Sequence, residues 1–381
     1  MQQTTCQVCI MDTTDPEIVF HGADGCNHCI NARARIEHDA FPGTEGEARL
    51  AALAETIKAA GRGREYDCLV GISGGVDSSY VIYKAKQLGL RPLALHLDNG
   101  WNSELAVHNI ERLMTKLGID LVTHVVDWEE IRDMQRACFN VPLMDIEIVS
   151  DHAIFAAMFK TAAQHGIKYI LSGSNVATES IMPRAWFYDK RDSRHVRAVH
   201  RKFGAGVRLK TFPFLSPWKF LQYVFVNKIR MIPMLNYGGF NKPMAVEFLG
   251  REFDWRPYPN KHGESTFTRF FQDYYLPAKF GIDKRRAHFS SMIAAGQMTR
   301  DEAISRLSTP LFTPEALAIE KEYVLKKLGY TSPEWDAIMA RPATPHQALP
   351  HNGWMFNTNN PLVQFIRRTT KMERGARGGR A

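Results

Sequence analysis

The sequence Ser73-Gly74-Gly75-Val76-Asp77-Ser78-Ser79 decides how this chain of 381 residues folds. It follows an apolar run at residues 66–72 that is typical of a buried strand. Beyond it, helical spacing of apolar residues continues until Gly89. A strand, a glycine-rich turn and a helix in this order direct free backbone N–H groups and a helix dipole at an anion. The stretch therefore predicts a phosphate-binding loop at the edge of a parallel sheet.

The residue types of this loop suit phosphate chemistry. Adjacent glycines let the backbone approach phosphate oxygens, the three serines add hydroxyl donors, and Asp77 supplies a carboxylate suited to Mg²⁺. The loop lacks the lysine of a Walker A motif, so a kinase that transfers a γ-phosphate is not indicated. A tight turn without a ligand would explain a lone glycine pair, but it does not explain the whole string.

Three more strands are expected at residues 92–97, 119–126 and 168–171, with helices at about residues 103–117 and 152–165. Strands that alternate with helices form a parallel sheet, and ligands bind at its carboxyl edge. Two further loops, Asp98-Asn99-Gly100 and residues 172–175, should therefore lie beside the glycine-rich loop. From residue 212 the alternation stops and helical signals dominate, including Thr299-x-x-Glu302, Thr313-Pro314 and Ser332-Pro333.

Four of the six cysteines form two pairs, Cys6-x2-Cys9 and Cys26-x2-Cys29, with 16 residues between them. This spacing is typical of a zinc ribbon, in which four thiolates bind one tetrahedral ion. A closed shell of thiolates leaves no position for a reactive water, so the predicted zinc is structural. Disulfides are the weaker alternative in a reducing compartment. His28 is interpreted as a bystander, because the four sulfurs already complete the shell.

Composition sets broad limits. The contents of 45% hydrophobic and 23% charged residues are those of an ordinary globular protein. The net charge of +8 favours anionic partners, although part of it lies in a basic tail that we interpret as solvated. No signal peptide is recognised, and the most apolar region, residues 212–235, contains three prolines, two lysines and an arginine. A soluble, cytoplasmic protein is expected.

Basic residues gather in two further regions. One spans residues 255–288 and offers Lys261, Lys284 and Arg285 as candidates for binding polyphosphate charge. The other spans residues 184–210, where nine arginines and lysines could receive a carboxylate or a nucleotide diphosphate. A solvated basic face is the alternative for both regions, and for the second neither interpretation is preferred.

The string SGGVDSS resembles the PP-loop of the ATP pyrophosphatase superfamily. Together with Met11-Asp-Thr-Thr-Asp-Pro after the first cysteine pair, residues 96–102 (HLDNGWN), Lys261-His-x-Glu-Ser and residues 279–286 (KFGIDKRR), it resembles the N-acetyl sugar amidotransferases of bacterial lipopolysaccharide, O-antigen and flagellar glycan biosynthesis. The likeness reaches about residue 340, and the basic tail has no counterpart. Such enzymes convert an acetamido group to an acetamidino group and release AMP and pyrophosphate.

The resemblance implies an α/β fold with a parallel-sheet PP-loop domain, an N-terminal zinc ribbon and a mostly helical C-terminal region. The expected segments are a ribbon at 1–35, a linker helix at 36–62, the PP-loop domain at 63–210, a substrate-binding region at 211–345 and the tail at 346–381. It implies Mg²⁺ at Asp77 and Glu179, although Glu179 could equally be an acid at a helix start. It also implies Asp77, Lys261, Lys284 and Arg285 as catalytic residues. The ATP-binding residues would be Ser73, Gly74, Gly75, Val76, Asp77, Ser78, Ser79, Leu97, Asp98 and Gly173.

Ammonia must come from elsewhere, because the sequence shows neither a Gly-x-Cys-x-Gly elbow nor another glutaminase module. Cys68 and Cys138, the remaining thiols, are expected in a strand and at a helix end. The resemblance implies a separate glutaminase and a synthase-like subunit like those of histidine biosynthesis. It also implies an acidic N-acetylated nucleotide sugar as substrate, with no role for a membrane.

A tRNA thiolase is the main alternative, because some thiolases also join a cysteine ribbon to a PP-loop. Basic and aromatic residues at 251–271 would suit RNA. Sulfur insertion in those relatives uses an additional cysteine cluster or a reactive pair, and Cys68 and Cys138 form no CxxC motif. The sugar enzyme is therefore preferred and nucleic acid is not expected as a partner. A non-catalytic zinc-ribbon module would leave the SGGVDSS loop unexplained.

Overall fold

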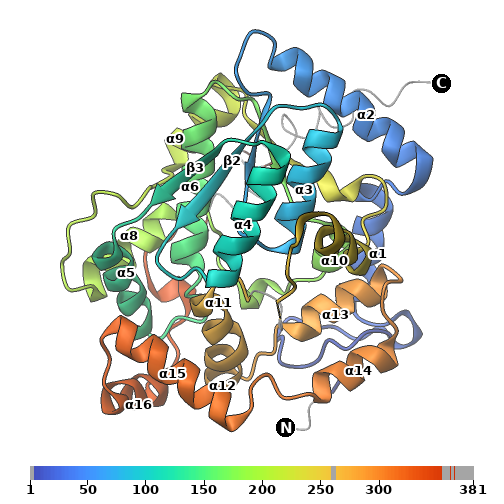
Figure 1. Ribbon diagram of the computed structural model, residues 1–381. Helices are drawn as coiled ribbons and strands as arrows, with labels where there is room; N and C mark the ends of the chain where they lie inside the picture. Colours follow the sequence, from blue (N-terminus) through green and yellow to red (C-terminus); the bar gives the residue numbers. More distant parts are fainter. Residues whose placement is uncertain (1–3, 259–262, 354–360, 362–363, 365–381) are drawn as a thin grey trace.

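A parallel sheet of five strands, in the order β3-β2-β1-β4-β5, lies at the centre of the computed structural model (Figure 1). The structure describes residues 4–258, 263–353, 361 and 364. The strands are β1 (Cys68–Gly71), β2 (Pro92–Asp98), β3 (Leu121–Val125), β4 (Tyr169–Ser172) and β5 (Arg230–Pro233). In register, Leu69 of β1 lies between Leu93 of β2 and Ile170 of β4. The predicted α/β class with a parallel sheet is confirmed.

Helices cover both faces of this sheet, which explains why its central strands are apolar throughout. Cys68 and Val70 face a core that also contains residues of α2 (Gly43–Ala60), α3 (Val76–Gln87), α4 (Glu104–Leu117) and α10 (Lys242–Phe253). Leu69 faces the opposite core, with residues of α5 (Trp128–Asn140), α6 (Ile148–Gln164) and α8 (Ser193–Phe203). Because successive side chains of a strand point to opposite faces, a strand between two cores must be hydrophobic at every position.

The four strands and two helices expected from the sequence are present, with ends shifted by a few residues. Ser103, expected as the first residue of a helix, is the N-cap of α4 and accepts a hydrogen bond from the Ala106 N–H. The fifth strand was not expected. Residues 230–233 pair with β4, so the sheet continues past residue 212, where the sequence indicated that the alternation ends.

The C-terminal half is mainly helical. It contains α9 (Pro217–Leu221), α11 (Thr266–Phe270), α12 (Leu276–Phe280), α13 (Arg285–Ala294), α14 (Arg300–Ser308), α15 (Pro314–Leu328) and α16 (Ser332–Ala340), with π-helical turns at Gln222–Val226 and Phe271–Tyr275. Thr313 caps α15 as predicted. The expected cap at Ser332 is wrong by one residue, because Thr331 caps α16 and forms a capping box with Glu334.

The N-terminal segment lies against this helical half. After short bridges between Thr5 and Asp12 and between Phe20 and Cys26, the chain forms α1 (Asn27–Asp39) and continues into α2. A short helix, α7 (Val176–Glu179), follows β4. Within the described parts of the chain, none of the helices has both the length and the apolar character needed to cross a bilayer.

Candidate active site and metal centre

The glycine-rich loop joins β1 to α3 and leaves the start of that helix open to a ligand. Gly75 is the N-cap of α3, and no side chain caps the first N–H groups. The loop is held from within, since the Gly75 N–H donates to Ser73 Oγ at 3.3 Å and Ser78 Oγ donates to the Gly75 carbonyl at 3.1 Å. An open helix start with a serine-braced turn is the geometry that binds phosphate.

Two glycines at this site lie in close packing. Gly74 has a φ of +83°, and an added Cβ would lie 2.8 Å from the Ala106 carbonyl oxygen. Gly173, after β4, would place a Cβ 3.1 Å from the Asp77 Cβ and 3.2 Å from the Ser78 nitrogen. The loop after β4 therefore lies directly against the first turn of α3, as predicted for Gly173.

The back of the loop is fixed by an aromatic segment that is distant in sequence. Trp255 Nε1 and Tyr258 OH each donate to the Gly74 carbonyl at 3.0 Å. Asn109 of α4 holds this segment, because its amide donates to the Arg256 carbonyl and to Tyr258 OH. The aromatic character of this stretch is visible in the sequence, but the contacts of Trp255 and Tyr258 with the loop are not predicted from it.

The loop after β2 is ordered by side-chain hydrogen bonds that start at Asp98. Its Oδ1 accepts from the Gly100 N–H at 2.9 Å and from Asn102 Nδ2 at 3.1 Å. The same amide nitrogen lies 2.9 Å from His96 Nε2, and His96 Nδ1 lies 2.9 Å from the Ile72 carbonyl oxygen. Since a carbonyl can only accept, His96 donates from Nδ1 and couples this loop to the glycine-rich loop.

Residues 264–266 pair with the loop after β2. Asn102 and Ser265 form an antiparallel bridge, the Ser103 N–H donates to the Glu264 carbonyl at 3.0 Å, and the Thr266 N–H donates to the Trp101 carbonyl at 3.1 Å. A Cβ added to Gly75 would lie 3.4 Å from Glu264 Oε1, so this carboxylate reaches the glycine-rich loop. Glu264 was not among the predicted site residues, although the Glu-Ser motif was the signal for it.

A charged cluster lies at the start of α6. Asn99 Nδ2 donates to Ser150 Oγ at 3.1 Å, which joins the loop after β2 to the first turn of this helix. Just before the helix, the buried Glu147 accepts from Gln272 Nε2 at 2.9 Å and forms an ion pair with Lys284 at 3.4 Å. Lys284 is only 8% exposed, and the negative charges of Glu147 and of the nearby Asp145 balance its burial.

The other predicted cations differ in position. Arg285 forms a bidentate pair with Asp283 and donates to the carbonyls of Arg306, Leu307 and Thr309 at the end of α14. Its guanidinium is thus occupied with closing a helix end, and these contacts do not support a role on polyphosphate. Lys261 lies outside the described residues.

Asp77 meets the requirement for a cation ligand. It lies in the first turn of α3, and its Oδ1 is buried without a hydrogen-bond partner among the described residues. Ser79 Oγ is also buried without a hydrogen-bond partner among the described residues. A buried carboxylate oxygen without a partner is costly, and a hard cation such as Mg²⁺ would satisfy it. Glu179 ends α7 and is partly buried. Its carbonyl accepts from Arg35 at 3.5 Å.

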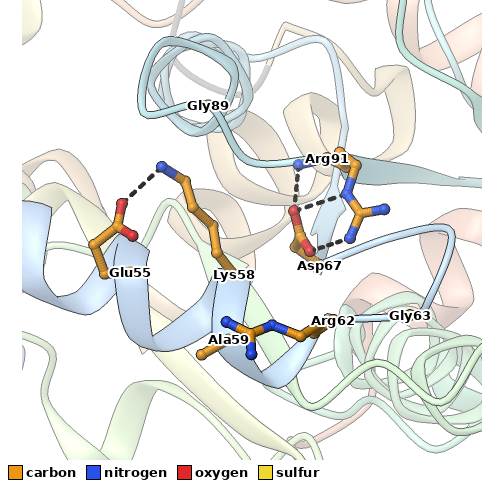
Figure 2. Close-up of a pocket in the computed structure, with 8 residues that line it drawn as sticks. All are labelled: Glu55, Lys58, Ala59, Arg62, Gly63, Asp67, Gly89 and Arg91. Carbon is orange, nitrogen blue, oxygen red and sulfur yellow. Dashed lines mark hydrogen bonds and ion pairs between the residues drawn. The ribbon is translucent and has the colours of Figure 1, made fainter.

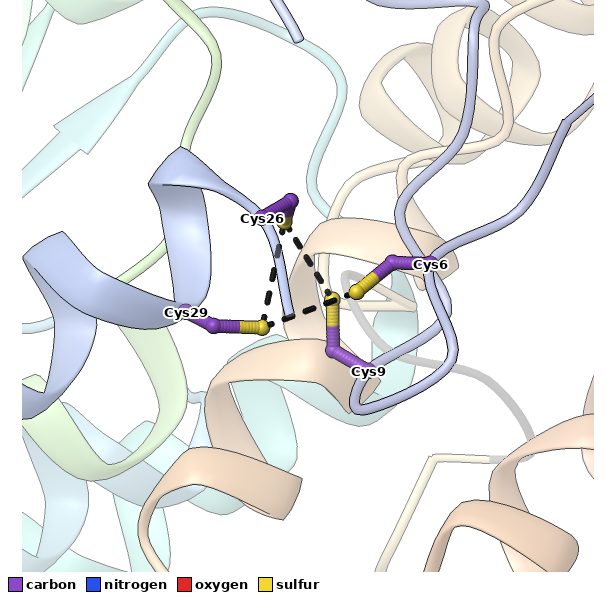
Figure 3. Close-up of side chains that lie close together, drawn as sticks. All are labelled: Cys6, Cys9, Cys26 and Cys29. Carbon is purple, nitrogen blue, oxygen red and sulfur yellow. Dashed lines mark hydrogen bonds between the residues drawn. The ribbon is translucent and has the colours of Figure 1, made fainter. Parts of the chain in front are cut away.

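The two cysteine pairs form one cluster (Figure 3). All four sulfurs are buried and lie within 4.8 Å of one another, with Cys6–Cys29 and Cys9–Cys26 both at 3.8 Å. Four sulfurs about 2.3 Å from a central ion would be about 3.8 Å apart, whereas a disulfide needs about 2.05 Å. The geometry suits a tetrahedral metal such as zinc. His28 pairs with Asp15 at 2.6 Å and, as predicted, is not part of the sulfur cluster.

The cysteine cluster is docked on α13 and α14. Arg300 donates to the carbonyls of Cys9 and Cys6, and Arg286 donates to the Ile10 carbonyl and pairs with the buried Asp12. Ser290 Oγ accepts from the Ile10 N–H at 3.2 Å. The motif Lys284-Arg285-Arg286 therefore serves three separate contacts in the structure, although it reads as one basic patch in the sequence.

A cavity of about 410 Å³ lies at the opposite edge of the sheet (Figure 2). Asp67 and Arg91 precede β1 and β2, and they form a bidentate pair there, with Nη2 to Oδ1 at 2.7 Å. Lys58 and Arg62 of the α2 region also line it. Because these residues lie at the amino ends of the strands, this cavity is separate from the glycine-rich loop.

Neither remaining thiol is in a reactive setting. Cys68 is 0% and Cys138 2% exposed, and burial raises the pKa of both thiols well above the ordinary value. A reactive cysteine needs an accessible thiolate. Cys68 is a core residue of β1, as expected, and Cys138 lies near the end of α5, as expected, where it is also buried.

Comparison with known proteins gives one family match. Residues 264–360 match the family described as "LPS biosynthesis protein WbpG-like, C-terminal domain". The resemblance to a lipopolysaccharide-biosynthesis family is thereby confirmed over this segment, which includes Glu264, α13 and α14. No curated protein sequence matches the chain.

The solved structures to which this chain is similar share little sequence identity with it. The NH3-dependent NAD synthetase from Campylobacter jejuni, in complex with nitrate, is 12% identical with a TM-score of 0.35, covering 79% of this chain and 99% of that chain. The NMN synthetase from Francisella tularensis is 14% identical with a TM-score of 0.35, covering 80% and 99%. A 4-thiouridine synthetase in complex with RNA and ATP is 17% identical with a TM-score of 0.29, covering 62% and 53%.

Proposed function

We propose that this chain is an ATP-dependent amidotransferase of surface-glycan biosynthesis. It converts the acetamido group of an acidic, nucleotide-linked sugar into an acetamidino group and releases AMP and pyrophosphate. The description of the matched family, lipopolysaccharide biosynthesis, supports the pathway class. The chemistry is inferred from the residues at the carboxyl edge of the sheet.

One observation carries the proposal, namely that four separate segments meet at that edge. The glycine-rich loop lies against Gly173, the loop after β2 is tied to it through His96, and residues 264–266 pair with the loop after β2. The open N–H groups at the start of α3, an Asp77 oxygen that has no partner among the described residues and the carboxylate of Glu264 therefore all lie in or beside the glycine-rich loop. This arrangement suits a nucleotide whose reacting phosphorus is presented to a second substrate.

The proposed reaction proceeds in two steps. The amide oxygen of the sugar attacks the α-phosphorus of ATP, and the bond to pyrophosphate breaks. Ammonia then adds to the imidate carbon, the C–O bond breaks with AMP as leaving group, and a proton is lost to leave the amidine. The amide oxygen ends in AMP. AMP is a far better leaving group than an amide oxygen, which is the reason for spending ATP.

The chain supplies binding and charge stabilisation in this scheme. The N–H groups at the start of α3 would bind the departing pyrophosphate, and Ser73 and Ser78 would hold the turn open for it. Asp77 would hold Mg²⁺, which neutralises phosphate charge when bound. Glu179 as a second carboxylate and Lys261 and Lys284 as charge stabilisers remain predictions. Arg285 is left out of this role, because its guanidinium is held by contacts at the end of α14.

Ammonia is proposed to come from a separate glutaminase with a synthase-like subunit. Hydrolysis of glutamine by this chain would need a reactive nucleophile, and Cys68 and Cys138 are both buried with raised pKa values. The same observation weakens the alternative of a tRNA thiolase, which also needs a reactive thiol. The four remaining cysteines are taken by the metal cluster, for which zinc is proposed.

The reaction can be tested with a heavy-oxygen label. Purified chain, ATP and an acetamido sugar labelled at the amide oxygen are incubated with ammonium or with glutamine, and the products are read by mass spectrometry. The expected result is labelled AMP and a cationic amidine with ammonium, and no turnover with glutamine. ADP as product, or AMP without label, would refute the mechanism. Turnover of glutamine by the lone chain would refute the separate partner.

Asp77→Ala provides the matched variant. It should abolish AMP formation and leave the metal content of the cysteine cluster unchanged, because the two sites share no residue. AMP release at the wild-type rate would remove Asp77 from its proposed role.

A further inference from the structure

Lys327, near the end of α15, contacts the loop after β2, which lies 227 residues earlier in the sequence. Its Nζ donates to the Gly100 carbonyl and, at 3.2 Å, to the hydroxyl of Tyr323 one helical turn before it. Gly100 is the residue whose N–H donates to Asp98 in the same loop. A side chain of the C-terminal helical half therefore holds a loop at the carboxyl edge of the sheet.

Three aromatic rings surround the ammonium group of Lys327. Its Nζ lies 4.7 Å from the ring centre of Trp101, 5.0 Å from that of Trp128 and 5.5 Å from that of Tyr323. An ammonium group within about 6 Å of an aromatic ring centre is attracted to the face of the ring, most strongly by tryptophan. Among the described residues no aspartate or glutamate pairs with Lys327, so its charge is held by the rings and by two oxygens.

The end of α15 has a different cation as its partner. Arg136 Nη1 donates to the carbonyls of Leu328 and Gly329 at 2.7 and 2.6 Å, and its guanidinium lies 4.0 Å from the centre of the Tyr330 ring. A cation at the carboxyl end of a helix is usually explained by the open carbonyls there. Because Arg136 binds these carbonyls, Lys327 is available for a bond to another segment.

The tip of the loop after β2 depends on this bond. Gly100 is exposed, has a φ of +79° and has no side chain that could fix it. In the part of the chain that the structure describes, Lys327 is the one donor to its carbonyl. A glycine without such an anchor samples a wide range of backbone conformations.

Trp101 connects the caged lysine to the rest of the catalytic edge. Its ring is buried, and its carbonyl accepts from the Thr266 N–H at 3.1 Å. Thr266 belongs to the segment that places the Glu264 carboxylate beside the glycine-rich loop. A displacement of Gly100 and Trp101 would therefore reach the groups that face the nucleotide site.

We propose that Lys327 is a positioning residue of the reaction, which holds the loop after β2 in the form that receives ATP. This inference rests on the proposed function, because it takes this edge of the sheet as the nucleotide site. Lys327 acts through Gly100 and Trp101.

Such a role has a kinetic signature. If the loop takes the receiving form for only part of the time, the apparent affinity for the nucleotide falls by that fraction. Saturating nucleotide selects the receiving form, so the rate at saturation is retained. Loss of Lys327 should therefore change KM for ATP and not kcat.

Three variants of the full chain test the role by calorimetry with α,β-methylene-ATP, which binds without being cleaved. Lys327→Met keeps the length of the side chain without its charge and should weaken binding by about 10-fold, as expected for the loss of a charged hydrogen bond and its cation–π contacts. Lys327→Arg keeps a charge that aromatic rings attract and should bind within about threefold of the wild type. Lys326→Met, at an exposed position on the same turn, should leave binding unchanged.

Two further measurements separate positioning from a purely structural role. In the ammonium assay, Lys327→Met should raise KM for ATP by about 10-fold and keep kcat within about twofold of the wild type. Exchange of the backbone N–H groups of residues 99–102 with deuterium should be faster in this variant and should slow again when nucleotide is bound. A contact that only stabilises the fold would lower the melting temperature and leave both measurements unchanged.

Three results would overturn the assignment. They are wild-type nucleotide affinity in Lys327→Met, a loss of affinity that Lys327→Arg shares in full, and an equal loss in Lys326→Met. The proposed function is tested separately. Labelled AMP formed by a chain in which Lys327→Met has wild-type affinity would refute only the positioning role, whereas weaker nucleotide binding by Lys327→Met in a chain that forms no AMP would refute only the reaction.

Discussion

Replacement of Gly74 by alanine tests the glycine-rich loop most directly. The backbone at Gly74 has a φ of +83°, where an alanine is strained by about 1–2 kcal/mol. The new Cβ would also lie 2.8 Å from the Ala106 carbonyl oxygen and 3.0 Å from Tyr258 OH. Comfortable contacts begin at about 3.5 Å, so the loop must shift by roughly 0.5–1 Å. Neither neighbour yields easily, because one is backbone and the other is hydrogen-bonded to Gly74 itself.

The shift would act on the N–H groups that bind the nucleotide. Misplacement of a reacting group by about 1 Å can lower a rate by about 100-fold. We therefore expect kcat/KM for AMP release to fall by about 100-fold, while the free energy of unfolding falls by only about 1–3 kcal/mol. AMP release is followed by chromatography, ATP affinity by calorimetry and stability by thermal unfolding.

Gly118→Ala is the matched control. Gly118 also has a positive φ, of +58°, but no atom lies within 4 Å of its added Cβ. The free energy of unfolding of this variant should fall because alanine is strained at a positive φ, but its AMP release should stay at the wild-type rate. If Gly74→Ala keeps activity within about threefold of Gly118→Ala, the loop does not place the nucleotide as argued.

Three further outcomes are expected. Cys26→Ser should lose the bound metal, measured by elemental analysis, and lower the melting temperature, since three thiolates no longer close a tetrahedral shell; unchanged metal content would contradict the cluster. Trp255→Phe removes one of two donors to the Gly74 carbonyl and should weaken ATP binding by about 10-fold, and an unaltered affinity would show that the donor is dispensable. Burial lowers the pKa of His152 from 6.5 to about 4, so the unfolded chain takes up the proton first. Stability should therefore be constant above about pH 6.5 and fall towards pH 4, by about 1.4 kcal/mol per pH unit for this residue. His152→Asn should flatten that slope in thermal unfolding, and an identical slope would exclude His152 as a contributor.

Features that depend on local chemistry could be predicted from the sequence. The glycine-rich loop, the loop after β2 and Gly173 follow strands whose apolar runs are continuous, and the carboxyl ends of parallel strands meet at one edge. The metal cluster could also be predicted, because two short cysteine pairs with the spacing of metal ligands are enough to specify it.

Features that depend on distant partners could not be predicted. β5 is a half-buried edge strand that contains Arg230 and ends at Pro233, so it lacks the apolar pattern of a central strand. Arg285 appears in the sequence as part of a basic run, but the acceptors at the end of α14 decide its role. The role of Trp255 could not be predicted either, because its partner is a backbone carbonyl 181 residues away.

The docking of the cysteine cluster also constrains the order in which the chain assembles during synthesis. The ligands all lie within the first 29 residues and can capture their ion as soon as this segment leaves the ribosome. The surface that receives the cluster is made much later, since the Ile10 N–H donates to Ser290 Oγ, 280 residues further along the chain. A metal-loaded but undocked cysteine segment should therefore persist until α13 has been synthesised. A chain truncated before α13 should still bind the ion, and it should expose the surface of the cysteine segment that α13 and α14 otherwise cover.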